Sequence, residues 1–437
     1  MKLKPLSQSG IFILAILLFS ACSKSGSNPT PQNNAPTIAS LSTNTGPYNT
    51  SVTITGTGFS PTAANDKVFF NGKAATVIAA SATEITATVP VGAGTGNVTV
   101  SVNGGVAISG PIFTYQLTSV VSTFVGSNQA GEVNGAGVLA ILNAPTGITI
   151  DTSGNLYAPD DGGVVRKVTP KAQVTSYAGE NYYDASLDGT VTSQQINFPS
   201  ALTMDNNNTL YVTELSTNRI LKITSSGTVT PFIEGVQSKG HFSPLSSLTG
   251  IAVDKMGNMF VVDQLNNLII KVTPNGISSI FAGTGEVGSA DGIGTSATFN
   301  NLQGITIDLS GNLYVSDYGN NLIRKITPDG TVSTFAGNIN GGYSDGIGVN
   351  ASFYIPGGLT TDKVGNVYVA DTGNGLIRKI TPSGTVTTIA GSRANRGAIV
   401  NGAASAAGFY KPTNLTIDAS GDIYVTDGNE IRKITIQ

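Results

Sequence analysis

The chain has 437 residues, of which only 11% are charged, with 23 basic and 26 acidic side chains, one His, one Cys and no Trp. The single Cys excludes a disulfide framework and a Cys-based zinc site, and the single His excludes a His-rich metal centre. A net charge of −3 without a basic block argues against nucleic acid as a partner. The 54 glycines, together with abundant Thr, Ser, Asn and Val, favour many short strands joined by tight turns.

The N-terminal segment 1–21 resembles the signal peptide of a bacterial lipoprotein. Lys2 and Lys4 precede an apolar run, 11–19, which is shorter than the roughly 20 residues that span a bilayer. Small residues stand directly before the sole Cys, as in a lipobox, and this resemblance implies that Cys22 is lipidated and anchors the chain to a membrane. A cleaved secretory signal is the alternative. We therefore expect a lipid-anchored protein of the cell envelope, in the outer membrane, with the leaflet left open.

Residues 22–35 are polar and contain prolines, which predicts a flexible tether. The next segment, 36–116, alternates short β-patterns with turn residues, and Asn71-Gly72 is a strong hairpin signal. Its opening Pro36-Thr37-Ile38 and the run Val52 to Phe59 resemble an IPT/TIG immunoglobulin-like domain. That resemblance implies a two-sheet sandwich that serves as a spacer or a binding module.

Segment 117–437 repeats one pattern six times. The pattern is Gly-[Ile/Leu]-x-x-Asp followed by Gly-Asn-x-Tyr-Val-x-Asp, and each copy supplies four predicted strands separated by turns, which is typical of a propeller blade. The motif resembles NHL repeats, and the resemblance implies a six-bladed β-propeller. The Asp that ends the first strand recurs as Asp151, Asp205, Asp254, Asp308, Asp362 and Asp418.

The sixth copy stops after three strands, at Gln437, and its missing fourth strand stands at the start of the domain. Val120 to Gly126 matches Thr331 to Gly337, the fourth strand of the fourth copy. We therefore expect the N-terminal strand to complete the last blade, because this pairing removes two exposed sheet edges. The predicted fold is all-β: an N-terminal immunoglobulin-like sandwich followed by a six-bladed β-propeller of the NHL type.

Several positions recur so regularly that they indicate scaffold. An apolar residue, predicted to plug the space between blades, stands nine residues before each first-strand Asp, and an Asp-Gly or Asn-Gly, predicted to form a local turn, stands 17 before it in five of the six copies. The Asp residues that end second strands are expected to bond backbone amides of the following turn. The repeated Ile-Arg-Lys-Ile is expected to lie on a solvated or snorkelling face. A carboxylate ring holding Ca²⁺ is the alternative for the Asx-Gly positions, and no other cofactor is expected.

Ligand-binding residues are expected where the repeat breaks down, on the face that carries the long links between blades. Glu214 replaces the second-strand Asp, and the third long link carries His241 in place of the Asx-Gly. Exposed aromatic rings beside amide and carboxylate groups suit sugar rings or extended peptides. The candidate ligand-binding residues are Tyr182, Tyr183, Glu214, Tyr343, Tyr354 and Tyr410.

No complete catalytic set is present, and no Gly-x-Ser-x-Gly elbow or Ser/His/Asp group is evident. The favoured interpretation is a non-catalytic envelope lipoprotein whose propeller binds a glycan or a protein. The alternative is a metal-assisted lactonase or lyase of the six-bladed propeller type, using Glu214 with Asp160 or Asp161. A purely structural scaffold for envelope complexes is a third possibility.

Overall fold

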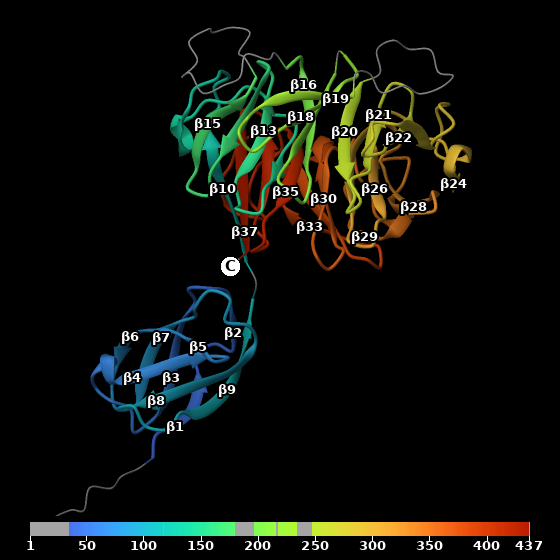
Figure 1. Ribbon diagram of the computed structural model, residues 1–437. Helices are drawn as coiled ribbons and strands as arrows, with labels where there is room; N and C mark the ends of the chain where they lie inside the picture. Colours follow the sequence, from blue (N-terminus) through green and yellow to red (C-terminus); the bar gives the residue numbers. More distant parts are fainter. Residues whose placement is uncertain (1–34, 117, 180–195, 216, 234–246, 437) are drawn as a thin grey trace, which may run out of the picture. The chain divides into compact units, whose positions relative to one another are not determined.

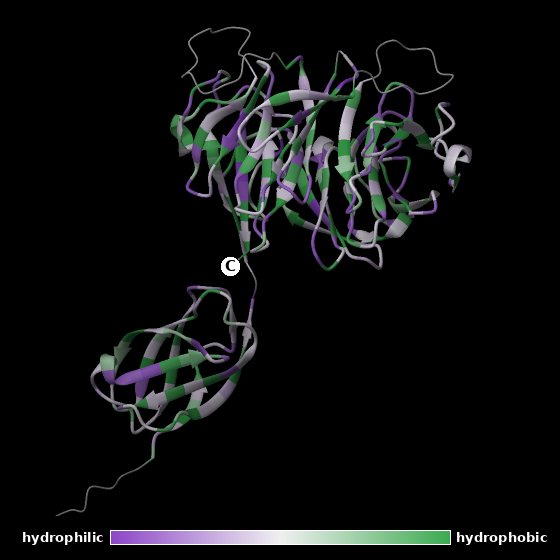
Figure 2. Ribbon diagram, in the orientation of Figure 1, coloured by the Kyte–Doolittle hydropathy of each residue, from purple (hydrophilic) through white to green (hydrophobic). Residues whose placement is uncertain are grey.

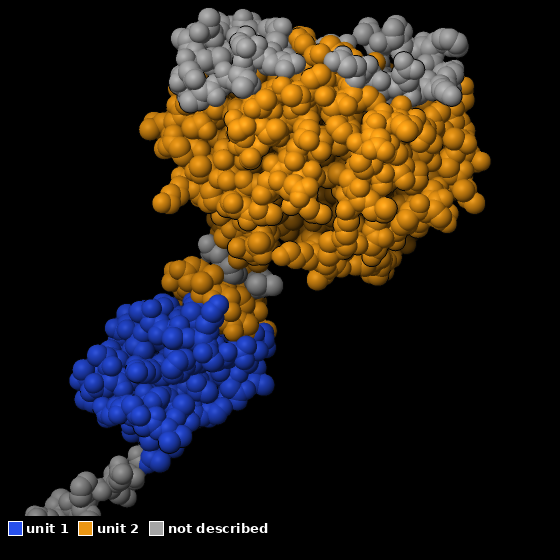
Figure 3. Space-filling model, viewed as in Figure 1, with its two compact units in different colours: residues 1–44, 51–90, 95–113 blue, residues 45–50, 91–94, 114–437 orange. Residues whose placement is uncertain are grey.

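The computed structural model describes residues 35–436 except 117, 180–195, 216 and 234–246. The predicted signal peptide, Cys22 and nearly all of the predicted tether lie outside these described residues. The chain forms two compact units, of which the second comprises 114–437 with the short segments 45–50 and 91–94 (Figure 3). Among the described residues, no helix is long and apolar enough to cross a membrane.

Residues 36–116 form a sandwich of two sheets, as expected for an IPT/TIG domain. One sheet has the order β1 (Thr37–Leu41), β3 (Ser51–Thr57), β7 (Glu84–Thr88) and β6 (Thr76–Ala80). The other has the order β2 (Thr45–Gly46), β9 (Ile108–Tyr115), β8 (Gly96–Val102), β4 (Asp66–Phe70) and β5 (Lys73–Ala74). Alternate residues of β3 are buried, and the rings of Phe70 and Phe113 meet edge to face at 5.1 Å in the core.

The described part of 117–437 forms six antiparallel sheets (Figure 1), each written here from its innermost strand outward. The first sheet is β12 (Thr149–Ile150), β13 (Leu156–Asp160), β14 (Val164–Val168), β15 (Gln173–Ala178), β11 (Gly135–Ala136), and the second is β16 (Pro199–Met204), β17 (Leu210–Glu214), β18 (Ile220–Ile223), β19 (Val229–Ile233). The third is β20 (Leu248–Val253), β21 (Met259–Asp263), β22 (Leu268–Val272), β23 (Ser278–Ala282), and the fourth is β25 (Leu302–Ile307), β26 (Leu313–Asp317), β27 (Leu322–Ile326), β28 (Thr331–Gly337), β24 (Gly292–Ile293). The fifth is β30 (Leu359–Thr361), β31 (Val367–Asp371), β32 (Leu376–Ile380), β33 (Thr385–Ala390), β29 (Gly346–Ile347), and the sixth is β35 (Pro412–Ile417), β36 (Ile423–Asp427), β37 (Glu430–Ile436), β10 (Ser119–Gly126), β34 (Gly402–Ala403).

The remaining elements of the described chain are single turns of 3₁₀ helix. They are η1 (Ala63–Asn65), η2 (Gly137–Leu139), η3 (Gly294–Ser296), η4 (Tyr318–Asn320), η5 (Gly348–Asn350), η6 (Thr372–Asn374) and η7 (Arg393–Asn395). η4 and η6 join the second strand of a sheet to the third, and they bring polar side chains to the rim of the propeller axis.

The six sheets close into a ring through the strand that begins the domain. β10 pairs antiparallel with β37, with Val121 opposite Ile434 and Thr123 opposite Arg432 (Figure 1). The innermost strand of each sheet contacts those of its two neighbours, and β12 contacts β35. The first and last segments of the domain therefore share one sheet.

Apolar clusters between neighbouring sheets hold the ring together, and Figure 2 shows hydrophobic residues distributed along its strands. Phe353, for example, packs with Tyr314 of β26 and Val369 of β31. The predicted plugs between blades are confirmed as fully buried residues at each described position, and Leu245 lies outside the described residues. The described plugs are Leu142, Ile196, Phe299, Phe353 and Phe409.

The strand directions give the propeller two different faces. The turn face carries the hairpins within each sheet, such as 308–312 and 327–331. The link face carries the connections after second strands, such as 318–321, and the long links between sheets, such as 338–358. The hairpins of the turn face have similar sequences in all sheets, whereas the links differ from one sheet to the next. Residues specific to one sheet therefore lie mainly on the link face.

Candidate functional site

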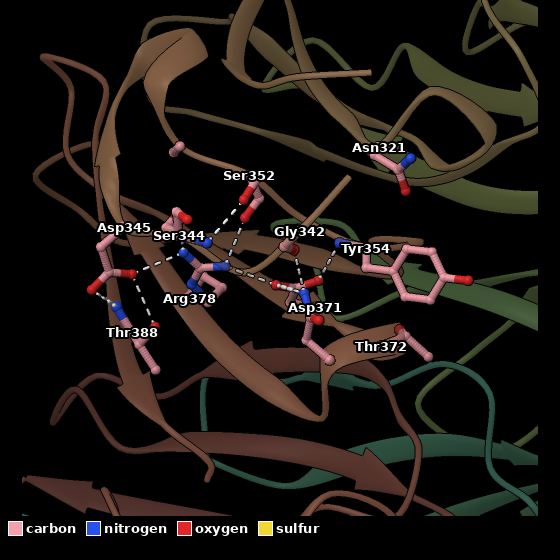
Figure 4. A network of polar contacts seen from close by, with 12 residues as sticks. Asn321, Gly342, Ser344, Asp345, Ser352, Tyr354, Asp371, Thr372, Arg378 and Thr388 are labelled. Carbon is pink, nitrogen blue, oxygen red and sulfur yellow. Dashed lines mark hydrogen bonds and ion pairs between the residues drawn. The ribbon is translucent and has the colours of Figure 1, made fainter. Parts of the chain in front are cut away.

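Buried Arg–Asp pairs lie beneath the link face. Arg378 is fully buried and donates to Asp371 and Asp345 at 2.8 Å each, as Figure 4 shows. It also donates to the carbonyl oxygen of Ser352 at 3.0 Å. Equivalent pairs join Arg166 to Asp160, Arg324 to Asp317 and Arg432 to Asp427 at 2.7, 2.8 and 3.1 Å.

The prediction that Ile-Arg-Lys-Ile forms a solvated face is therefore wrong for its arginines. Alternate strand residues point to opposite faces of a sheet, and in a propeller both faces pack against neighbouring sheets. Arg378 consequently points into the interior, where its guanidinium lies 5.1 Å from the centroid of the Phe353 ring. The adjacent Lys379 points the other way, and its ammonium lies 5.8 Å from the ring centroid of Tyr368.

The carboxylates also bond differently from the prediction. Asp371 accepts the backbone N–H of Tyr354, 17 residues earlier, at 2.8 Å, and Asp317 accepts that of Asn300 at 2.9 Å. These bonds reach back to the preceding long link, whereas the predicted bond to the following turn is present at Asp263, which accepts the N–H of Asn266 at 3.3 Å. At the four described Asx-Gly positions the expected local turn is likewise replaced by longer contacts, and Asp188 lies outside the described residues. Their side chains accept from the buried arginines, through Asn134, Asp291, Asp345 and Asn401.

Glu214, a candidate ligand-binding residue, occupies the Asp position in the second sheet and is fully buried. Its carboxylate pairs with Arg219 at 2.7 Å and accepts the N–H of Asn197 at 2.7 Å. Leu221 stands at the site of the buried arginine, and Arg219 reaches the carboxylate from outside the strand. The longer Glu side chain thus pairs with an arginine and accepts a backbone N–H of the preceding link, as Asp does in other sheets. Both of its carboxylate oxygens therefore have protein partners.

Burial controls the titration of these carboxylates. It raises the pKa of Asp160 to about 7 and that of Asp371 to about 6, although the paired arginine and the accepted N–H groups act in the opposite direction. Among the residues that the structure describes, no three His, Cys, Asp or Glu side chains gather as ligands for a metal ion. Two acidic groups of the lactonase alternative, Asp160 and Glu214, are instead taken up by ion pairs, and its third, Asp161, is exposed.

The axis of the ring opens on the link face through a cavity of about 200 Å³. Threonines at its rim donate to backbone oxygens of the next sheet: Thr146 to Ser200 at 2.9 Å and Thr372 to Pro412 at 2.7 Å. A hydroxyl that has donated its proton still offers acceptor lone pairs. The cavity is lined by Thr146, Ser200, Thr249, Gln303, Gly304, Tyr318, Gly357, Gly358, Thr372, Lys411, Thr413 and Asn414.

Aromatic rings stand beside this mouth. Tyr354 and Tyr410 directly follow two of the buried plugs and are 46% and 57% exposed. Tyr354 lies against the η6 turn, where its carbonyl accepts the N–H of Gly373 at 2.9 Å, and Figure 4 shows its ring directed away from the Arg378 network. Tyr343 is also exposed, and the guanidinium carbon of Arg393 stacks 3.6 Å from its ring centroid.

The structure thus brings three of the candidate residues to the link face: Tyr343, Tyr354 and Tyr410. Tyr182, Tyr183 and His241 lie outside the described residues. The sequence did not single out Tyr318 and Lys411, which line the mouth, or Phe198, which is 52% exposed two residues before Ser200. Phe198 has a positive φ of 49°, a backbone conformation that is rare for a bulky residue and that no sequence pattern here announces.

A larger cavity, of about 460 Å³, opens on the turn face. Met256 and Leu309 are exposed at its rim. The Asp side chains around it accept hydrogen bonds within their own turns. Asp308, for example, accepts the N–H groups of Ser310 and Asn312 at 2.9 Å. This end of the axis therefore presents the repeating hairpins of the scaffold, and the link face presents the sequence-specific groups.

Comparisons with known families agree with this architecture. The family model described as IPT/TIG domain matches residues 36–117, and the model described as Teneurin NHL domain matches residues 123–284. The chain therefore contains an IPT/TIG domain followed by a segment that matches an NHL domain. Teneurin-1 of Mus musculus is 28% identical over 226 residues, which are 43% of this chain and 8% of the relative. The chain spans only a small part of the length of the curated relatives that it matches.

Solved structures share the fold of this chain over nearly its whole length. An auxiliary nutrient binding protein from Bacteroides ovatus is 18% identical with a TM-score of 0.67, covering 92% of this chain and 98% of its own. A protein of unknown function from Bacteroides thetaiotaomicron is 21% identical with a TM-score of 0.62, covering 93% and 99%. At these identities the likeness establishes the all-β fold of a sandwich followed by a propeller.

Proposed function

We propose that this protein is a non-catalytic lipoprotein of the cell envelope, and that its propeller binds a glycan or protein ligand at the link-face mouth. The observation that carries the proposal is that the polar groups fall into two sets, one bonded within the scaffold and one open to a ligand. Five of the six buried second-strand carboxylates form ion pairs, and the sixth, Asp263, accepts hydrogen bonds from Asn266. Hydroxyl acceptors, by contrast, line the mouth, and the exposed rings of Tyr354 and Tyr410 lie on the same face. Rigid aromatic surfaces beside a few fixed polar groups are what a recognition site requires.

The name of one solved neighbour is compatible with this role, since the Bacteroides ovatus protein is called an auxiliary nutrient binding protein. The N-terminal features support the envelope location, with residues 1–21 as a lipoprotein signal peptide, Cys22 as the lipidated residue and 22–35 as the tether. In this proposal 36–116 is the spacer and 117–437 the binding propeller. The outer membrane is the proposed site of anchoring.

Binding is tested with a panel of immobilised polysaccharides and envelope proteins, using the full chain and a Tyr354→Ala/Tyr410→Ala variant. We expect a ligand whose affinity falls at least tenfold in this variant. The matched control is Met256→Ala/Leu309→Ala, which removes two exposed apolar side chains from the turn-face mouth and should leave binding unchanged. Equal weakening by both variants, or weakening by the control alone, would place the ligand elsewhere and refute the proposed site.

Anchoring is tested separately by fractionating cells that express the native chain or Cys22→Ser. The native chain is expected in the membrane fraction with a lipid on Cys22, detected by metabolic labelling with a fatty acid. The Cys22→Ser chain is expected to lose both the label and the membrane association. Unlabelled native protein in the soluble fraction would contradict the lipoprotein assignment.

A further inference from the structure

Positive charge is concentrated on one part of the link face. The long link between the fifth and sixth sheets, 391–411, contains Arg393, Arg396 and Lys411 and no acidic residue. Each of the other five links carries at least one Asp or Glu, in a chain with more acidic than basic residues. Even the Asx-Gly of this link is neutral, because Asn401 stands where the preceding two sheets have Asp291 and Asp345.

These three cations are exposed and available. Among the described residues, no carboxylate forms an ion pair with any of them. Asp345 and Asp427, two carboxylates of the fifth and sixth sheets, are already committed, since Asp427 is paired with Arg432 and Asp345 with Arg378. The link therefore presents its charge to solvent and not to the scaffold.

Residues of the η6 turn contact, or lie next to residues that contact, two arginines and two tyrosines of the link face. The side-chain amide of Asn374 donates to the carbonyl of Gly342, next to Tyr343, at 2.7 Å. A Cβ on Gly373 would lie 2.4 Å from the Tyr354 ring, and a Cβ on Gly375 would lie 3.3 Å from Cγ of Arg396. We name Tyr343, Tyr354, Arg393 and Arg396 the η6 cluster.

The η6 cluster adjoins the mouth of the axis. Thr372, the first residue of η6, lines the mouth and donates to the carbonyl of Pro412 at 2.7 Å. Lys411 precedes that proline and lines the same cavity. A ligand at the mouth can therefore contact Lys411 together with the rings and guanidinium groups of the η6 cluster.

Resting on the proposed binding function, we propose that the ligand is an anionic saccharide, with carboxylate or sulfate groups bound by Arg396, Lys411 and the Arg393–Tyr343 stack. Guanidinium groups suit carboxylate and sulfate because they present paired donors in a plane. The exposed faces of Tyr343 and Tyr354 suit sugar rings, and the hydroxyl acceptors of the mouth suit sugar hydroxyl donors. The acceptors and the rings together favour a saccharide over an acidic peptide.

The test uses two pairs of probes that share a sugar backbone and differ in their anionic groups: polygalacturonate against its fully methyl-esterified form, and dextran sulfate against dextran. Binding of the full chain is measured by affinity electrophoresis and isothermal titration. We expect at least one anionic member to bind ten times more tightly than its neutral counterpart, with an affinity that falls as salt rises. The first pair reports carboxylate recognition and the second reports sulfate recognition.

Arg396→Gln/Lys411→Gln is expected to weaken binding of the anionic probe at least tenfold, whereas Lys363→Gln, an exposed cation at the turn-face mouth, should leave it unchanged. Since all three residues are exposed, unchanged thermal midpoints verify that the variants fold. Binding of a neutral polysaccharide that depends on Tyr354 but not on Arg396 or Lys411 would overturn this inference and leave the proposed function standing. Tighter binding of polyglutamate than of either anionic polysaccharide, or no binding of either, would also overturn it.

Discussion

The guanidinium of Arg378 lies 2.8 Å from the carboxylate of Asp371, and both side chains are fully buried. A buried pair of this kind contributes little net stability when compared with apolar residues, but removing one partner leaves the other charge without compensation. The pair also helps to position the preceding long link, because Asp371 accepts the N–H of Tyr354. The ion pair beneath the surface therefore positions an aromatic ring of the proposed site.

Arg378→Ala is expected to lower the free energy of unfolding by about 3–5 kcal/mol, because it isolates the buried charge of Asp371. The neighbouring Lys379→Ala removes a half-buried cation that lies over Tyr368 and should cost no more than about 1 kcal/mol. Urea denaturation followed by circular dichroism compares the two variants. Equal midpoints for Arg378→Ala and Lys379→Ala would show that the pair does not hold the sheet.

Because Phe353 fills the space between two sheets, the stability lost on substitution should depend on the size of the side chain that replaces it. Phe353→Ala leaves a cavity between the fourth and fifth sheets and should cost about 3–5 kcal/mol. Phe353→Leu should cost less than about 1.5 kcal/mol, because Leu142 fills the equivalent position between the sixth sheet and the first. Thermal midpoints of the two variants provide the comparison, and a leucine variant as unstable as the alanine variant would contradict the equivalence of the plugs.

Closure of the ring predicts a specific cross-link. Val121 and Ile434 lie directly opposite in the pairing of β10 with β37. Opposite Cβ atoms in an antiparallel ladder are about 4.5–5.5 Å apart, close to the separation that a disulfide spans. In a Cys22→Ser background, Val121→Cys/Ile434→Cys should form a disulfide on oxidation and migrate faster on a non-reducing gel.

The matched control for this cross-link is Val121→Cys/Lys433→Cys. Lys433 directly precedes Ile434 on the same strand, and its side chain points to the opposite face of the sheet. It should remain unlinked under the same conditions. Equal cross-linking of both pairs, or of neither, would be inconsistent with the register that closes the ring.

The raised carboxylate pKa values predict a stability that falls with rising pH. Asp160 and Asp371 have pKa values of about 7 and about 6 in the folded state, against an ordinary value of 3.8. Between these limits the folded chain binds protons that the unfolded chain has released, so the free energy of unfolding decreases as pH rises through the window.

Urea midpoints measured from pH 5 to pH 8 should therefore decrease, and Asp160→Asn should flatten the upper part of the curve. A midpoint that rises steadily across the same range would mean that the arginine partners outweigh burial.

The sequence carries the repeat, and with it most of the fold. The plug positions could be predicted because an apolar residue recurs at one distance from the first-strand Asp, and the match of Val120–Gly126 to Thr331–Gly337 indicates which strand shares a sheet with the chain's last segment. The burial of Arg378 could not be read from charge alone, because Arg and Lys alternate on a strand whose two faces are both covered. One clue is present: the third copy lacks both the Asx-Gly and the arginine, with Ile270 in its place.

The candidate site was only partly predictable. Tyr354 and Tyr410 stand out because aromatic residues follow the plug in these two copies. Lys411 and Arg396 become site residues only when the η6 turn places them beside the mouth. Glu214 looked like an exception in the sequence, yet the ion pair with Arg219 restores the scaffold contact that Asp makes in other sheets.

The absence of Trp from the chain allows a direct test of where the ligand binds. Tyr354→Trp places a single fluorescent reporter at the link-face mouth, and Leu309→Trp places one at the turn-face mouth. Each variant is titrated with the polysaccharide or protein that binds the native chain. The account predicts a saturable change in Trp emission for Tyr354→Trp and none for Leu309→Trp; a change confined to Leu309→Trp would contradict it.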